Sequence, residues 1–274
     1  MNRLPLRERR PGAPLARILW FESIRILTRA IFRVVYRPIV IDAHRVPTKG
    51  PLLIAANHQS YLDPPLVGDY PARQCAFVAR AGLFKVPIFA PLIRSLDATP
   101  IKESGNDRGA IMTVLELLKN GQAVVIFPEG SRSTDGAMHQ FKRGLALLVK
   151  MGKVPVVPAA LEGCYDCFPP GGRPRFFWRG PRVALQFGDP ISYEEFMKDG
   201  PDAGLQHVER EVDRMRLNLR SLLRARNSDH FPANTAGDGA VTPDAPTARP
   251  EAAAEPLPEK RSASPSAGES RTGS

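Results

Sequence analysis

The sequence has little cysteine, and this scarcity limits both its expected compartment and its metal chemistry. Three cysteines, Cys75, Cys164 and Cys167, occur in 274 residues. They are too few for a disulfide framework, so we expect a reducing compartment. Cys164 and Cys167 have the spacing of a metal-binding pair, but a structural zinc takes four ligands, and the sequence has no second cysteine pair. We therefore predict that these cysteines are small core residues and that no metal is bound.

Long apolar segments are also missing. No stretch of about 18 apolar residues is free of charge, so no membrane-spanning helix is predicted. The N-terminus has no unbroken apolar core before a cleavage site, so a signal peptide is not expected. The length of the chain, 274 residues, suffices for one ordinary domain with a substantial core and flexible appendages.

Positive charge, in contrast, is plentiful and unevenly distributed. The net charge is +10. Residues 1–37 contain nine arginines and two acidic residues, about +7, whereas residues 227–274 contain four basic and seven acidic residues, about −3. An excess of this kind at the N-terminus indicates an anionic surface as a partner, either phospholipid or nucleic acid.

Residues 15–37 are predicted to form an amphipathic helix. Arg25, Arg29, Arg33 and Arg37 recur every four residues, and apolar side chains cover most of the remaining surface. Arginines can reach lipid phosphates while aromatic rings lie at headgroup level, so we favour docking on a membrane. The alternative is a helix packed on the domain with a solvated basic edge. Nucleic acid is not an expected partner, because the aromatic patterns of RNA-binding modules are missing.

The rest of the chain alternates between apolar runs of strand length and segments of helix length. This alternation predicts an α/β fold with a mixed, largely parallel central sheet flanked by helices. The predicted strands are 38–47, 51–56, 75–79, 99–101, 123–127, 154–161 and 182–187. The predicted helices are 64–70, 108–119, 144–151, 192–197 and 204–226, with short helical pieces in 80–96 and a loop at 164–180.

The two ends of the chain are expected to lie outside the folded domain. Residues 1–14 carry arginine, proline and glycine and are predicted to be flexible. Residues 227–274 are rich in Ala, Pro, Ser, Gly and Glu, cannot bury a core, and are predicted to be a disordered tail. The folded domain is therefore expected to cover residues 38–226.

A histidine and an aspartate lie in the loop that follows the predicted strand 51–56. His58 leaves the strand end, and Asp63 lies five residues later, just before Pro64 and Pro65. A loop, unlike a continuous helix, lets the imidazole meet the carboxylate. A histidine held by an aspartate is suited to act as a general base toward an alcohol. The alternative is a surface histidine beside a helix-capping aspartate.

A second polar loop follows the buried strand 123–127. Its sequence is Phe-Pro-Glu-Gly-Ser-Arg-Ser over residues 127–133, and Lys142 and Arg143 follow shortly after. Gly130 permits close approach of a ligand to the backbone, and Arg132 can bind a phosphate with two hydrogen bonds. Ligands bind at strand ends in α/β folds, so this loop and the His58 loop are candidates for one pocket. The alternative is a polar turn with solvated charges.

The two loops together resemble those of a known enzyme family. His58, four residues and Asp63, followed by the 127–133 loop, are similar to the motifs of glycerolipid acyltransferases of the 1-acylglycerol-3-phosphate O-acyltransferase type. The likeness runs from about residue 33 to 190. It includes the blocks 83–87 and 154–158, which resemble the lesser motifs of the family.

The resemblance implies a role for each motif residue. His58 is the general base on the acceptor hydroxyl, and Asp63 orients it. The acceptor site is expected to contain Glu129, Gly130, Ser131, Arg132 and Lys142. Val156 and Pro158 belong to a motif assigned to donor binding or packing. Where the family usually has an arginine after the short strand at 99–101, this chain has Lys102 and, further on, Arg108, and either can supply the charge; Ala90 replaces a common glycine.

The resemblance also implies the partners. The hydroxyl of a lysophospholipid attacks an acyl thioester from acyl-CoA or acyl carrier protein, without a cofactor or metal, at the cytoplasmic face of the cell membrane. The expected acceptor is 1-acylglycerol-3-phosphate, which gives phosphatidic acid. The alternatives are another acceptor, such as a lyso-ornithine lipid or other lysophospholipid, and a non-enzymatic basic protein that binds membranes.

Overall fold

The computed structural model describes residues 4–10, 12–80, 82, 99–101, 107–176 and 182–241. Seven strands form one sheet in the order β1-β7-β6-β2-β5-β3-β4. Five of the six strand pairings are parallel, and β6 with β7 is antiparallel. The predicted mixed, largely parallel sheet is therefore confirmed. The strands are β1 (Ile39–Ile41), β2 (Leu52–Ala56), β3 (Cys75–Arg80), β4 (Thr99–Ile101), β5 (Ala123–Ile126), β6 (Val156–Glu162) and β7 (Ala184–Phe187).

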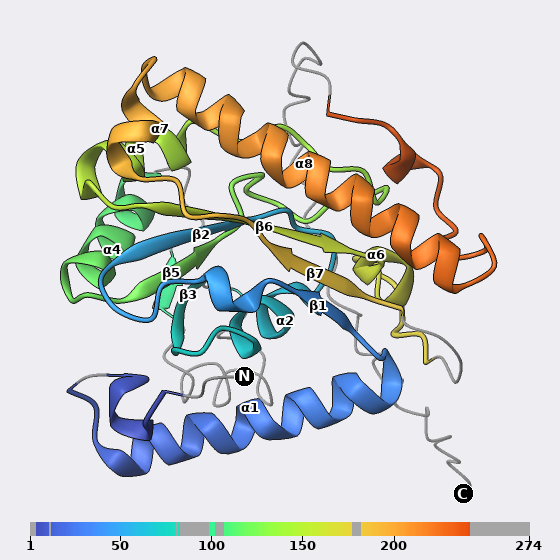
Figure 1. The fold of residues 1–274 in the computed structure, drawn as a ribbon, viewed down its shortest axis with the longest axis horizontal. Coiled ribbons are helices and arrows are strands. Elements are labelled where there is room, and N and C mark those ends of the chain that lie inside the picture. The colour runs from blue at the N-terminus through green and yellow to red at the C-terminus, as the bar shows by residue number, and fades with distance from the viewer. Residues whose placement is uncertain are drawn as a thin grey trace, which may run out of the picture. The chain divides into compact units, whose positions relative to one another are not determined.

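Helices cover both faces of the sheet (Figure 1). One face packs against α4 (Asp107–Lys119), α5 (Gly144–Gly152), α7 (Tyr193–Met197) and α8 (Pro201–Arg226), and the other against α1 (Leu15–Val35), α2 (Asp63–Asp69) and α6 (Cys164–Cys167). Successive residues of a strand point to opposite faces. Leu53 and Val124 accordingly join the first core cluster, and Ile54 and Val125 join the second. This two-sided burial explains why the central strands are continuous apolar runs.

The predicted elements agree with the observed ones apart from their ends. The expected strand 38–47 is shorter, because β1 stops at Ile41 and a 3₁₀ turn, η2 (Ala43–Arg45), follows. The expected loop at 164–180 begins with the short helix α6. The short helical pieces expected in 80–96 lie outside the described residues, apart from Arg80 and Gly82.

Helix α1 is amphipathic, but its arginines do not form one outward stripe. Arg25 is 5% exposed; it donates to the carbonyl of Pro71 at 3.1 Å and pairs with Glu22 at 3.0 Å. Arg29 donates to the carbonyl of Asp69 and stacks over the ring of Tyr70. These two arginines bind the body of the protein through α2, which corrects the expectation that they reach lipid phosphates.

The outward face of α1 is apolar instead. Ile26 and Val34 are 63% and 70% exposed. Further exposed apolar side chains lie on the same face of the helix: Leu15, Leu19, Trp20, Leu27 and Ile31. Arg17 and Arg33 are exposed at the edges of this face. We call these seven apolar residues the α1 apolar face. Within the described residues, no helix is long and apolar enough to cross a membrane.

Both ends of the chain are more ordered than composition predicts. At the N-terminus, a 3₁₀ turn, η1 (Leu6–Glu8), precedes Arg9, which pairs with Glu22 and accepts a hydrogen bond from the backbone of Gln74. At the C-terminus, ordered contacts continue past residue 227 as far as Val241, and Phe231 is buried in the second core cluster. The expected boundary at 227 is thus placed too early, because buried arginines of α8 bind this segment. Residues 242–274 lie outside the described part.

Candidate active site

The two polar loops lie next to each other because their strands are neighbours. β2 and β5 pair in parallel, with Ala55 opposite Ile126, so both chains leave the sheet at the same edge. The backbone N–H of Ser133 donates to the carbonyl of His58 at 2.8 Å. The sheet and this hydrogen bond therefore bring together residues that are more than 60 positions apart in the sequence.

His58 and Asp63 form a hydrogen-bonded pair. His58 Nδ1 lies 2.8 Å from Asp63 Oδ2, the aspartate is fully buried, and the His58 side chain is 16% exposed. The same Oδ2 accepts the backbone N–H groups of Gln59 at 2.5 Å and Ser60 at 2.7 Å. Because Oδ2 already acts as an acceptor for two backbone N–H groups, the arrangement in which it also accepts from His58 places the hydrogen on Nδ1. Nε2 is therefore the ring nitrogen with the available lone pair.

Two further contacts fix the imidazole and its loop. The ring of Phe127, at the end of β5, stacks on His58 with centroids 4.0 Å apart and an interplanar angle of 19°. The hydroxyl of Ser60 donates to the carbonyl of Phe168 at 2.6 Å. The Ser60 hydroxyl is thus bound to the backbone and not to His58.

Glu129 lies beneath the site rather than in it. Its side chain is buried; Oε1 accepts the backbone N–H of His58 at 2.7 Å and Oε2 accepts that of His139 at 3.0 Å. Burial raises the pKa of Glu129 to about 8, although the two amides lower it. The carboxyl group therefore connects the two loops, and both oxygens are occupied by the protein itself.

Arg132 lies over the ring of a residue in the His58 loop. Its guanidinium carbon is 3.6 Å from the centroid of Tyr61, and Phe168 packs against that ring with centroids 5.2 Å apart. One terminal nitrogen of Arg132 is buried and meets no acceptor among the described residues. An unpaired buried donor on a cation is costly, so this nitrogen is suited to an anionic ligand.

Lys142 and Gly130 lie against each other at the same loop. Gly130 has a φ of +76°, and a Cβ there would come within 2.5 Å of Lys142 Nζ. The positive φ favours a glycine at this position, whereas the flexible Lys142 side chain could move aside for a Cβ. Lys142 is exposed, as is Ser131. The structure thus brings Ser131, Arg132 and Lys142 together with His58 at one edge of the sheet.

The remaining predicted residues lie elsewhere. Lys102 falls outside the described residues. Arg108 is exposed in the first turn of α4, which follows the outermost strand β4. Strand β3 lies between β4 and β5, so β4 is roughly 10 Å, or two strand spacings, from the strand that carries the second loop. Val156 and Pro158 are buried in β6 and contribute packing.

The two cysteines with metal-like spacing are free thiols in the core. Cys164 and Cys167 are both 0% exposed, and burial raises the pKa of each thiol. No cluster of histidine, cysteine and carboxylate side chains in the described part of the chain is arranged to hold a metal ion.

Comparison with known proteins agrees with this geometry. The sequence profile of the family described as Acyltransferase matches residues 37–162. The 1-acyl-sn-glycerol-3-phosphate acyltransferase of Bacillus subtilis is 28% identical over 158 residues, which are 57% of this chain and 75% of that protein. The yeast protein of the same name is 32% identical over 157 residues, 55% of this chain and half of its own length.

A solved structure shows the same fold. The crystal structure of the 1-acyl-sn-glycerophosphate acyltransferase PlsC from Thermotoga maritima superposes with a TM-score of 0.65 and 28% identity, over 75% of this chain and 82% of that one. Residues 37–162 therefore match an acyltransferase domain. The matched range contains both loops, including the segment from His58 to Asp63. The hypothesis of a non-enzymatic basic protein is therefore removed.

Several residues that shape this acyltransferase site were not predicted from the sequence. Tyr61 and Phe127 stack on Arg132 and His58, and Gln59 binds Glu162 behind the loop. Gln59 and Tyr61 lie between His58 and Asp63 in the sequence, which placed them near the site. The sequence did not reveal which residues they contact. The contacts join β2, β5 and β6, which are distant in sequence, and only the sheet order brings them together.

Glu129→Gln tests the role of the buried carboxyl group in the acyltransferase. A glutamine has one acceptor oxygen, so one buried backbone N–H loses its partner, and the free energy of unfolding at pH 5 should fall by about 1–3 kcal/mol. Because the folded-state pKa of about 8 lies above the ordinary value, the wild type loses stability as the pH rises towards 8. The difference between the two proteins should therefore narrow over that range.

Urea denaturation at several pH values measures both effects. Ser131→Ala, an exposed neighbour, is the control and should change stability by less than about 0.5 kcal/mol. Equal stability of the Glu129→Gln protein and the wild type at pH 5, or a gap that widens with pH, would contradict the assignment.

Proposed function

We propose that the protein transfers a fatty acyl group from an acyl thioester to the free hydroxyl of a lysophospholipid, with 1-acylglycerol-3-phosphate as the acceptor. The observation that carries this proposal is the His58–Asp63 pair at 2.8 Å beside the unpaired nitrogen of Arg132. A base and an anion-binding cation at one sheet edge fit an acceptor that has both a hydroxyl and a phosphate. The relatives named above carry this activity in their names.

The reaction needs one proton acceptor and an oriented alcohol. His58 Nε2 removes the proton of the acceptor hydroxyl as its oxygen attacks the thioester carbonyl. Asp63 stabilises the imidazolium that forms, as carboxylates do in other histidine-based sites. The tetrahedral intermediate then expels the thiolate, which takes the proton back from Nε2. The products are an ester and a free thiol, from acyl-CoA or acyl carrier protein, and no acyl-enzyme forms.

The acceptor phosphate is proposed to bind Arg132. The aromatic stack of Tyr61 and Phe168 holds the guanidinium plane, and a planar guanidinium can donate two parallel hydrogen bonds to a phosphate. Lys142, against Gly130, adds a second positive charge at the same loop. Anchoring the phosphate in this way would bring the neighbouring hydroxyl of the lipid to the base.

We also propose that the α1 apolar face docks the protein on a membrane. A lysolipid resides in a bilayer, and large contiguous apolar patches on a protein surface mark interaction sites. The exposed Arg17 and Arg33 flank the face and can contact phosphates there. The inward Arg25 and Arg29 attach α1 firmly to α2, so docking does not require the helix to leave the body.

His58→Ala tests the catalytic step. Loss of a general base lowers turnover by about 10²- to 10⁴-fold, so thiol release from acyl-CoA with 1-acylglycerol-3-phosphate should fall by that factor. His139→Ala is the matched control, since His139 has a half-exposed side chain and contributes its backbone to Glu129. Undiminished turnover in folded His58→Ala protein, shown by circular dichroism, would remove His58 from this role.

Arg132→Lys tests the acceptor. The lysine keeps the charge but loses the planar stack and the paired donors, so the KM for 1-acylglycerol-3-phosphate should rise about tenfold or more. The KM for a lyso-ornithine lipid, which has no phosphate, should not change. Arg143→Ala, a well-exposed neighbour paired with Asp202, is the control. If wild-type protein prefers the lyso-ornithine lipid, the acceptor assignment is wrong while the chemistry stands.

Replacing Ile26, Leu27 and Val34 by serine tests the docking face. In flotation with vesicles that contain anionic phospholipid, the affinity of the protein for the vesicles should fall by about tenfold or more. Each side-chain methylene that is no longer buried in the bilayer costs about 0.8 kcal/mol of binding free energy. The control replaces three exposed apolar residues on the opposite face of the sheet: Met112, Leu147 and Met151. Equal flotation of the two triple variants would refute docking through α1.

A further inference from the structure

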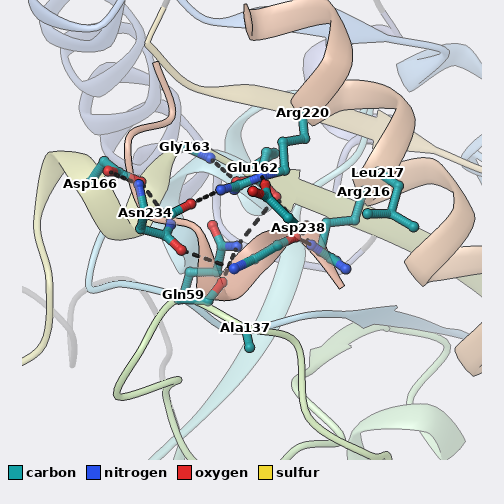
Figure 2. Close-up of polar contacts among 12 residues, drawn as sticks. Gln59, Ala137, Glu162, Gly163, Asp166, Arg216, Leu217, Arg220, Asn234 and Asp238 are labelled. Carbon is teal, nitrogen blue, oxygen red and sulfur yellow. Dashed lines mark hydrogen bonds and ion pairs between the residues drawn. The ribbon is translucent and has the colours of Figure 1, made fainter. Parts of the chain in front are cut away.

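A cluster of buried charges lies behind the His58 loop (Figure 2). Glu162, the last residue of β6, is 0% exposed, and Arg216 and Arg220 of α8 are 0% and 2% exposed. Arg220 pairs with Glu162 at 2.8 Å, and Arg216 lies 3.8 Å from the same carboxylate. Arg216 also pairs with Asp213 at 2.6 Å. Charges this deeply buried are costly unless every group is paired.

The segment after α8 completes this pairing. We call residues 231–241 the C-terminal strap. Arg220 donates to the carbonyl of Asn234 and pairs with Asp238 at 2.6 Å. The carbonyls of Gly237 and Gly239 accept from Arg216. The strap therefore supplies the acceptors that the two buried arginines lack on their own helix.

The strap is attached at both of its ends. Asp166, in α6, accepts the backbone N–H groups of Ala233 and Asn234, each at 3.1 Å, and the side chain of Asn234 at 2.9 Å. At the other end, the N–H of Val241 donates to Asp213 at 3.0 Å. The strap thus returns along α8 and lies between that helix and the loop that follows Arg132.

The strap touches that loop directly. A Cβ on Gly136 would come within 2.7 Å of the Asn234 side chain, and the carbonyl of Gly136 lies close to Gly237. On its other side, Gly136 accepts a hydrogen bond from Gln59 at 3.4 Å, and Gln59 also donates to Glu162 at 3.5 Å. Gln59 is the neighbour of His58, and its own N–H binds Asp63. The contacts therefore run from the strap to both catalytic loops.

We propose that the C-terminal strap is a positioning element of the acyltransferase site, with Asn234 as its positioning residue. Asn234 holds the 133–137 loop, and so Arg132, against the His58 loop, while Glu162 and Gln59 hold the opposite side. This inference rests on the function proposed above. The matched family range ends at residue 162, so the strap is a feature of this chain outside that range.

Both Gln59 contacts are long, which gives the proposal its physical basis. At 3.4 and 3.5 Å both contacts are near the limit of a hydrogen bond. The side-chain oxygen of Gln59, Oε1, is buried and meets no hydrogen-bond donor among the described residues. Packing between Gly136, Glu162 and the strap, more than hydrogen bonding, therefore keeps Gln59 in place. A small shift of the strap can move the loops, and displacements of about 1 Å can cost about 10²-fold in rate.

Asn234→Ala tests the proposal in the full chain. It removes the contacts with Asp166, Gly237 and Gly136 but keeps every buried charge. The KM for 1-acylglycerol-3-phosphate should rise about tenfold, while the KM for the thioester stays within about twofold. Thr235→Ala, an exposed residue in the same strap, should match the wild type. A chain that ends at residue 241 should also match it, and one that ends at residue 230 should lose most of its turnover.

Hydrogen exchange of the 58–63 and 131–137 amides gives a readout that does not depend on activity. Faster exchange in both loops of Asn234→Ala supports the strap, even if the shortest chain fails to fold. Unchanged exchange and an unchanged acceptor KM, with only a smaller active fraction, would overturn it. If the wild type releases no thiol with any acceptor, the proposed function fails, and the exchange rates still decide whether the strap positions the loops.

Discussion

The site depends on the hydrogen bonds that the buried carboxylate of Asp63 accepts. One of its oxygens accepts from His58 Nδ1 and from the backbone of Gln59 and Ser60. It therefore shapes the loop and sets the imidazole tautomer at once, because an ionised carboxylate can only accept. The turn that begins α2 places Asp63 at that point, with prolines in the first helical turn where their missing N–H costs nothing.

The second loop is held to the first mainly by groups that do not face the substrate. Glu129 bridges the amides of His58 and His139, Ser133 donates to the carbonyl of His58, and Phe127 stacks on its ring. Motif residues of this kind therefore serve two purposes. Glu129 holds the backbone of both loops, whereas Arg132, stacked on Tyr61, is the residue that we propose for the anion; preorganisation of this kind is what a binding site requires.

Arginine has three different environments in this protein. Arg132 stacks on Tyr61 near the surface of the site, Arg25 binds carbonyl and carboxylate oxygens under α1, and Arg216 and Arg220 are buried with Glu162. A net charge of +10 therefore describes the molecular surface poorly. On α1 the inward arginines leave the apolar side chains outside, so the proposed docking of this surface on a membrane would rest on burial of apolar area more than on charge.

The sequence by itself determined the strands, the central helices and the pairing of His58 with Asp63. Apolar runs such as 52–56 and 123–126 are typical of buried strands, and a loop from His58 to Asp63 lets the two side chains meet. Only the tertiary structure decided which side of α1 faces outward. Arginines and apolar residues alternate around this helix, and the partners of Arg25 and Arg29 are backbone carbonyls at the end of α2 and in the turn after it. It likewise decided that residues 231–241 are ordered. Their composition buries little apolar area, and they are held by side-chain donors of Arg216 and Arg220 on α8, the helix that precedes them, a pairing that no local pattern reveals.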